Sequence, residues 1–185
     1  AFYQATRKVV INEPLNPTKP AIKEVWSTKE IATREFLNFL SDLKIQEALA
    51  RNEKLDREAD IIKTWFVDFE MLLKKVFQDD ALQLLFNYKD YSFQILTQGK
   101  TFKFTEMSDG FAAVLEIIID LILKMQRKGT LTRAYQQEGI VLIDEVETHL
   151  HLELQRLVLP LLTQLFPNIQ FIVTTHSPFV LNSIG

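Results

Sequence analysis

The chain has 185 residues, 47% of them hydrophobic and 24% charged, which is enough for one domain with a buried core. Its formal net charge of −3 at pH 7 gives no overall basic field, so capture of nucleic acid or of an acidic membrane by charge alone is not expected. The absence of cysteine excludes thiol catalysis, disulfides and cysteine-ligated zinc, and it is compatible with the cytoplasmic location that we expect.

Two long helices are predicted in the first half of the chain. Ser27, followed three residues later by Glu30, has the pattern of a capping box and predicts a helix that runs to about residue 50. A second helix is predicted from Asp56 to Phe77, where apolar and aromatic residues recur at helical spacing. We interpret these aromatic residues as core rather than as a surface that stacks on nucleic-acid bases.

A small antiparallel sheet and a long helix follow. Residues 82–88, 91–98 and 100–107 alternate apolar and polar side chains between turn-like dipeptides, which predicts a meander of three strands. From Ser108 onward the chain predicts an apolar helix in which charged residues recur every four positions, so we expect one narrow edge to face water. Because these charges interrupt the helix and its apolar stretch is shorter than roughly 20 residues, no membrane span is expected.

The last third of the chain predicts half of an α/β sheet. The segments "IVLI" (140–143) and "IQFIVTT" (169–175) are continuous apolar runs, typical of parallel strands that are covered on both faces. A leucine-rich helix between them provides the crossover that two parallel strands need.

Polar residues follow both predicted strands, at the edge where parallel sheets bind ligands. Asp144 suits a Mg²⁺ ion, because this ion prefers oxygen ligands. Glu145 is suited to orient or polarise a water molecule that attacks a phosphate, and His176 to contact the terminal phosphate. The predicted start of the long helix adds Ser108 and the backbone of Gly110 as a phosphate contact.

These segments resemble the motifs of ABC-type ATPases. "IVLIDE" is similar to the Walker B strand, "MSDGF" to the signature motif usually written LSGGQ, and "TTHSP" to the switch-histidine strand. The loop "DEVETHLH" resembles the DExExHLH pattern of the branch that includes the RecF, SMC-like and OLD ATPases. In this pattern His151 stands where transporters carry the D-loop aspartate. The signature departs from the usual pattern at Asp109 and Phe111, which replace a glycine and a glutamine.

The resemblance implies a P-loop NTPase-like ABC ATPase head. We expect a partial parallel sheet flanked by helices, with a helical lobe and antiparallel strands in residues 1–105 and the motif-bearing half in residues 106–185. In this family two heads enclose two ATP molecules with Mg, and each head offers its signature motif to the nucleotide of the other. Ser108, Gly110 and His151 would therefore contact nucleotide in a homodimer, with Asp144 at the metal and Glu145 and His176 as catalytic residues.

The Walker A loop GxxxxGK[ST] is absent from the 185 residues, and the chain begins without a methionine. We therefore interpret the chain as the C-terminal portion of a longer ATPase. The family's usual tasks are DNA repair, DNA handling and antiphage defence, so DNA and a nuclease or another effector protein are expected partners.

Two other interpretations stay open at the level of sequence. The first is a non-catalytic module that only dimerises or docks on a partner. The second is a zinc or other transition-metal site built from Glu147, His149 and His151, because alternating histidines on an extended loop can share one face.

Overall fold

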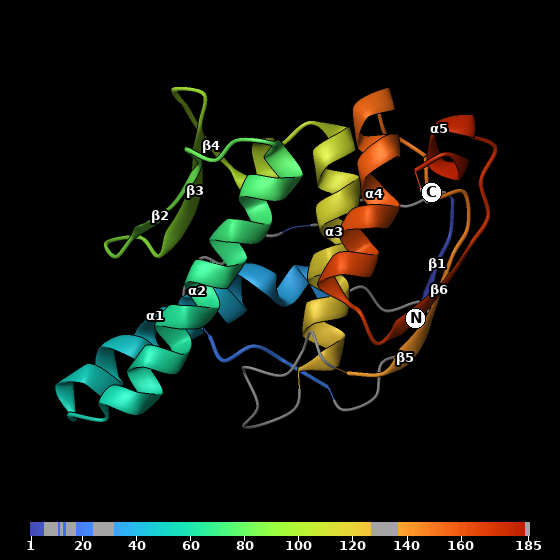
Figure 1. The fold of residues 1–185 in the computed structure, drawn as a ribbon. Coiled ribbons are helices and arrows are strands. Elements are labelled where there is room, and N and C mark those ends of the chain that lie inside the picture. Colours follow the sequence, from blue (N-terminus) through green and yellow to red (C-terminus); the bar gives the residue numbers. More distant parts are fainter. Residues whose placement is uncertain (6–10, 12, 14–17, 24–31, 127–136, 184–185) are drawn as a thin grey trace.

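The computed structural model describes residues 1–5, 11, 13, 18–23, 32–126 and 137–183, and Figure 1 shows their arrangement. The predicted capping box at Ser27 and Glu30 lies outside the described residues. The elements in chain order are β1 Phe2–Tyr3, η1 Ala32–Glu35, α1 Phe36–Asn52, α2 Asp56–Phe77, β2 Gln83–Asn87, β3 Ser92–Thr97, β4 Lys100–Lys103, η2 Phe104–Glu106, α3 Asp109–Met125, β5 Gly139–Ile143, α4 Leu152–Leu165, β6 Ile169–Val173 and α5 Pro178–Leu181.

The helix α2 has the bounds that the sequence predicts. It begins with two acidic residues in its first turn, which favours a helix start, and it ends where Gln78 takes the left-handed conformation at φ 52°. The ring of Trp65 stacks on Phe69 with a centroid distance of 5.4 Å, and both side chains are buried. The interpretation of these aromatic residues as core is confirmed, except that Phe77 at the end of the helix is only half-buried.

The predicted antiparallel meander is confirmed. The strands β2, β3 and β4 pair in that order, and the last pair, Thr97 with Lys100, closes a tight turn at Gly99. Gly99 has a φ of 73°, a left-handed conformation that glycine adopts without steric cost. This sheet lies beside the helical pair and away from the parallel sheet (Figure 1).

The parallel sheet has the strand order β1-β5-β6, and α3 and α4 lie on one side of it (Figure 1). The parallel pairing of β5 with β6 confirms the strand–helix–strand crossover. The sequence does not predict β1, which consists of only two residues. Its register places Phe2 beside Leu142 and Tyr3 beside Ile143.

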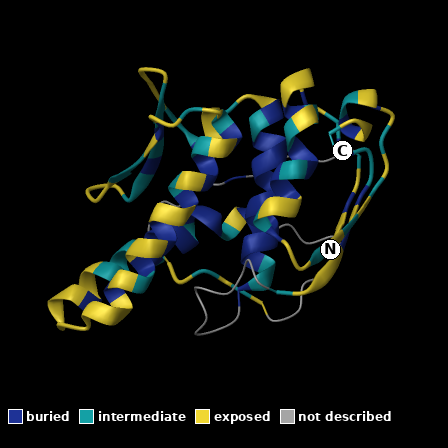
Figure 2. Cartoon of the chain, viewed as in Figure 1, coloured by how far each residue is buried: buried dark blue, intermediate teal, exposed yellow. Residues whose placement is uncertain are grey.

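The expectation that both faces of this sheet are covered is wrong for the described residues. Side chains on the face toward α3 and α4, such as Val141 and Ile143, are 2% and 1% exposed. On the opposite face, Ile140 is 58%, Leu142 41% and Ile172 50% exposed, and in Figure 2 much of this sheet is coloured yellow and teal. The reason is that α3 and α4 cover one face only, and no described helix lies against the other.

The expected water-facing edge of α3 is also wrong. Glu116 and Asp120 are 4% and 1% exposed, because this edge faces η1 and β1 instead of solvent. The carboxylate of Asp120 accepts hydrogen bonds from the Tyr3 hydroxyl and the Ala32 N–H, each at 2.7 Å, and forms a 2.8 Å ion pair with Lys124. A buried carboxylate is stable when it has three such partners. The charged residues that recur every four positions along α3 therefore belong to a buried contact and not to a solvent-facing edge.

None of the described helices is long and apolar enough to cross a membrane.

Candidate functional site

The carboxyl ends of the three parallel strands meet at one edge of the sheet. The Asp144 N–H donates to the Tyr3 carbonyl at 2.8 Å, and the Thr174 N–H donates to the Ile143 carbonyl at 3.0 Å. The first residues beyond the strands, Gln4, Asp144 and Thr174, therefore follow one another across the sheet. This is the edge where open α/β sheets bind ligands.

Thr174 connects the two acidic residues that follow β5. Its hydroxyl donates to Asp144 Oδ1 at 2.7 Å and accepts from the Glu145 N–H at 2.7 Å. The backbone of Thr174 adds a third bond, because its carbonyl accepts from the Val146 N–H at 3.1 Å. The Asp144 carboxylate and the backbone of Glu145 are thus held by one residue of the neighbouring strand.

Glu145 has a left-handed backbone with φ 46°, which is uncommon for a residue with a side chain. This turn directs its side chain away from the course of β5, so that Glu145 Oε1 lies 3.8 Å from His176 Nε2. The Glu145 side chain is 44% and the His176 side chain 89% exposed, so both groups can reach a ligand in solvent. We call Asp144, Glu145, Thr174 and His176 the strand-end cluster.

Glu147 holds the backbone of His176. Its Oε1 accepts from the His176 N–H at 2.6 Å. Burial raises the pKa of the Glu147 carboxyl, but hydrogen bonds from the Thr175 hydroxyl and the His176 N–H outweigh burial and leave the pKa below its usual value. Glu147 is therefore ionised at neutral pH, and as a hydrogen-bond acceptor it connects the loop after β5 with the loop after β6.

A second group of residues surrounds the start of α3. Ser108 is the N-cap residue, is exposed, and makes no side-chain bond to the helix. Gly110 is buried under the loop before α4: a Cβ atom at this position would lie 3.2 Å from the His149 carbonyl oxygen and 3.5 Å from a ring carbon of His151. The rings of Phe111 and His151 meet edge to face at 5.7 Å. We call Ser108, Gly110, Phe111 and His151 the helix-start cluster.

The predicted site residues thus form two groups joined by one loop. Asp144, Glu145 and His176 come together, whereas Ser108, Gly110 and His151 lie together at the helix start. The alternative transition-metal site is not formed. Among the described residues no three His, Asp or Glu side chains are placed to hold a metal, because Glu147 turns to the His176 backbone and His151 turns to Phe111.

Two residues at the strand ends, Gln4 and Thr174, are not predicted from the sequence, and Glu147 is predicted only as a ligand of the alternative metal site. The doubled threonine before His176 is a weak signal for Thr174, since hydroxyls near paired acids often orient them. Gln4 has no signal at all, because a strand of two residues has no periodicity.

The side chains present fit Mg²⁺ and a nucleotide. Mg²⁺ usually binds one or two carboxylates and takes its other ligands from water and phosphates, and Asp144 is a carboxylate that a hydroxyl orients from behind. The start of the 17-residue helix α3 presents backbone N–H groups and the positive end of its dipole, which favour phosphate.

Most of the chain matches the model of a known protein family. The family model described as "AAA domain, putative AbiEii toxin, Type IV TA system" matches residues 12–182. The chain is 29% identical over 140 residues to the "Retron Vc95 probable ATPase" of Vibrio cholerae serotype O1 biovar El Tor, covering 75% of this chain and 25% of that protein. It is 37% identical over 82 residues to the "Septu protein PtuA" of Bacillus mycoides, covering 44% of this chain and 11% of that protein.

Among solved structures, the chain resembles an SMC head bound to the C-winged helix domain of ScpA. The TM-score is 0.50 at 16% identity, over 80% of this chain and 44% of that one. The likeness confirms the predicted fold class, a P-loop NTPase-like α/β head with a partial parallel sheet. The chain spans a quarter or less of the two curated relatives named above.

Proposed function

Since the chain belongs to this AAA-domain family, we propose that it is the C-terminal part of a longer ATPase of the SMC, RecF and OLD type that hydrolyses Mg-ATP. The observation that carries the proposal is the strand-end cluster. At one edge of the sheet it brings together a carboxylate for the metal and a second carboxylate for water, from two residues that are both hydrogen-bonded to Thr174, and an exposed histidine 3.8 Å from the second carboxylate.

Asp144 binds the metal in this proposal. Its Oδ1 already accepts from Thr174, so the carboxylate is oriented before any ion arrives. Mg²⁺ held there would neutralise negative charge on the phosphates of ATP.

Glu145 positions the attacking water molecule and accepts its proton. The left-handed turn separates its side chain from Asp144, so the two adjacent carboxylates serve different tasks. Glu145 Oε1 lies 3.8 Å from His176 Nε2, close enough for the carboxylate to attract a protonated imidazole, and in this proposal His176 contacts the γ-phosphate, where negative charge increases during the reaction.

Ser108 and Gly110 act on a nucleotide bound by a second head, in a homodimer that encloses two ATP molecules. The exposed Ser108 hydroxyl and the start of α3 provide phosphate contacts, and His151 completes this side from the loop before α4. Gly110 serves two purposes, because its missing side chain also lets this loop approach α3.

We propose that the cycle of ATP binding and hydrolysis controls an effector, for example a nuclease, in the cytoplasm. Relatives from Septu and retron systems favour antiphage defence over DNA repair or DNA handling as the setting. DNA remains a candidate partner of the whole protein.

The change Glu145→Gln tests this function in the longer protein. It keeps the shape and the hydrogen-bonding capacity of the side chain but removes the base, so we expect ATP turnover to fall by at least about 100-fold while ATP and the dimer are retained. Glu153→Gln, at an exposed position in the first turn of α4, is the matched control. Unchanged turnover in Glu145→Gln would contradict the role given to Glu145, and a longer protein without ATP turnover whose assembly Glu145→Gln leaves unchanged would be a non-catalytic docking module.

A further inference from the structure

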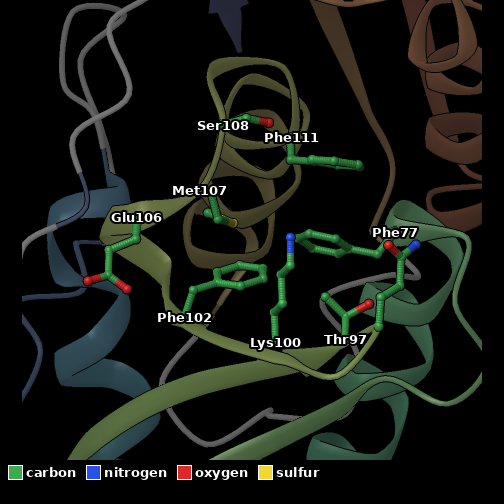
Figure 3. A pocket seen from close by; sticks show the side chains of 9 residues that line it. Phe77, Thr97, Lys100, Phe102, Glu106, Met107, Ser108 and Phe111 are labelled. Atoms are coloured by element: carbon green, nitrogen blue, oxygen red, sulfur yellow. The ribbon is translucent and has the colours of Figure 1, made fainter.

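A cavity of about 240 Å³ lies beside Ser108 (Figure 3). The end of α2, the turn between β3 and β4, and the segment before α3 form its walls. We call it the aromatic pocket, and its defining residues are Phe77, Thr97, Lys100, Phe102, Ser108 and Phe111.

Three phenylalanine rings line the pocket and remain partly exposed. Phe77 stacks on Phe111 with a centroid distance of 4.4 Å and an interplanar angle of 15°, and its centroid lies 6.0 Å from that of Phe102. All three are half-buried, whereas Phe104, between Phe102 and Phe111 in the sequence, is fully packed in the core. Apolar surface left in water costs roughly 25 cal/mol per Å², so a flat apolar group that covers these rings is favoured.

Two polar groups at the pocket, the Lys100 ammonium and the Ser108 hydroxyl, can contact an anion. Figure 3 shows the Lys100 side chain extending from β4 toward the phenylalanine rings. The Lys100 ammonium has no salt bridge with any other described residue, and the Ser108 hydroxyl does not cap α3. Glu106, which also lines the pocket, is occupied on one oxygen by the Lys103 N–H at 2.8 Å.

The size of the cavity restricts what it can hold. Sites for whole small molecules usually have volumes of about 300–1,000 Å³, so this cavity fits a single ring system. A nucleotide offers both groups that the pocket can bind. Its base is a ring that can stack among the phenylalanines, and its phosphates are negative groups that can lie next to Lys100 and the start of α3. An aromatic side chain of a partner protein would fill the same space but would leave Lys100 without a counter-charge.

We propose that the aromatic pocket receives the purine base of a nucleotide whose phosphates face Ser108. The inference rests on the proposed function, in which a second head holds that nucleotide. It also gives Phe111 a role. The residue replaces the usual glutamine of the signature motif, and its ring forms a wall of the pocket and also meets the His151 ring edge to face.

Side-chain NMR of the 185-residue chain, with ATP and with tripolyphosphate at millimolar concentration, tests the proposal. We expect ATP to shift the ring signals of Phe102 and Phe111 and the Lys100 signals, and tripolyphosphate to shift only amides near Ser108. Phe102→Ala should weaken ATP binding about tenfold through lost stacking and leave tripolyphosphate binding unchanged. Phe86→Ala is the control, because Phe86 is a half-buried ring of the same sheet outside the pocket.

If Phe102→Ala fails to fold, Lys100→Gln replaces it, since this exposed residue has no packing role and its loss should still weaken ATP binding severalfold. Equal shifts with ATP and tripolyphosphate, or no shift in the pocket, would overturn the proposal. Shifts confined to Asp144, Glu145 and His176 would overturn it while supporting the proposed function. A phenylalanine-bearing peptide that shifts the pocket signals when ATP does not would assign the pocket to a protein partner and overturn the purine proposal.

Discussion

Thr174 illustrates how a single hydroxyl can set the geometry of two acidic residues. It donates to the Asp144 carboxylate and accepts from the Glu145 backbone N–H, so neither the Asp144 side chain nor the Glu145 backbone can move away without breaking a 2.7 Å bond. A group that orients a metal-binding carboxylate from behind commonly contributes one to two orders of magnitude to metal affinity or activity.

Thr174→Val removes both bonds and keeps the shape of the side chain. In the longer protein we expect ATP turnover to fall about 10- to 100-fold and the Mg²⁺ concentration for half-maximal rate to rise, because Asp144 loses its orienting partner. Steady-state kinetics at varied Mg²⁺ measures both effects. Thr101→Val, on an exposed position of β4, should change neither, and an unchanged Mg²⁺ requirement in Thr174→Val would contradict the role given to Thr174.

Part of the candidate site can be predicted from single residues in sequence. Asp144, Glu145 and His176 follow apolar strands directly, and parallel strands bring such residues to one edge. Thr174 and Glu147 are not predictable in the same way. Their bonds depend on the left-handed turn at Glu145 and on the path of the following loop, and no periodic pattern encodes either.

Among the elements, α3 connects the helix-start cluster with β1 and η1. Its start carries the helix-start cluster, and its middle holds β1 and η1 through Asp120. The bounds of α2 were predictable because its apolar spacing is regular. The environment of the charged edge of α3 was not, because the same four-residue spacing suits water and a buried ion pair equally well.

Asp120→Asn should lower the free energy of unfolding by about 3 kcal/mol, because it leaves Lys124 without its charged partner and weakens two buried hydrogen bonds. Tyr3→Phe should cost about 1 kcal/mol, and the double variant less than the sum, since the two residues share one bond. Urea unfolding measures all three, and Asp68→Asn on the exposed side of α2 is the control. A loss in Asp120→Asn no larger than in the control would contradict this account.

Gly110→Ala tests the contact between α3 and the loop before α4. Alanine favours a helix over glycine by up to about 1 kcal/mol, but its Cβ would lie 3.2 Å from the His149 carbonyl, and such crowding costs about 1–3 kcal/mol. We therefore expect a net destabilisation of roughly 1 kcal/mol in thermal or urea unfolding. Gly139→Ala meets no atom within 4 Å and should be neutral, whereas a stabilised Gly110→Ala variant would refute the close contact.

For the whole molecule, the most informative feature is the face of the parallel sheet that α3 and α4 do not cover, which we call the open face. Phe2, Leu142 and Ile172 lie in register across three strands and are 37%, 41% and 50% exposed. A row of this kind costs free energy in water and is suited to an apolar cover. The fold class was predictable from the order of motifs and strands, but the one-sided cover was not, because an apolar strand does not reveal how many layers pack on it.

This open face agrees with the proposal that the chain is part of a longer ATPase. In the longer protein, a segment that carries the Walker A loop, which we call the phosphate-loop segment, would cover this face and complete the head. The chain spans only 25% of the retron ATPase and 11% of the Septu protein that it resembles, so most of their length lies beyond the matched region. In this account the open face and the Mg-ATP site are completed together, which links folding of the head to nucleotide binding.

Calorimetric titration with Mg-ATP tests whether the phosphate-loop segment completes the nucleotide site. The titration is made first with the 185-residue chain alone and then with the chain combined with that segment. We predict no micromolar binding by the chain alone and micromolar binding after the segment is added, with the weak contact at the aromatic pocket remaining in the millimolar range. Micromolar binding of Mg-ATP by the chain alone would contradict the account, because the strand-end cluster would then not need a phosphate loop.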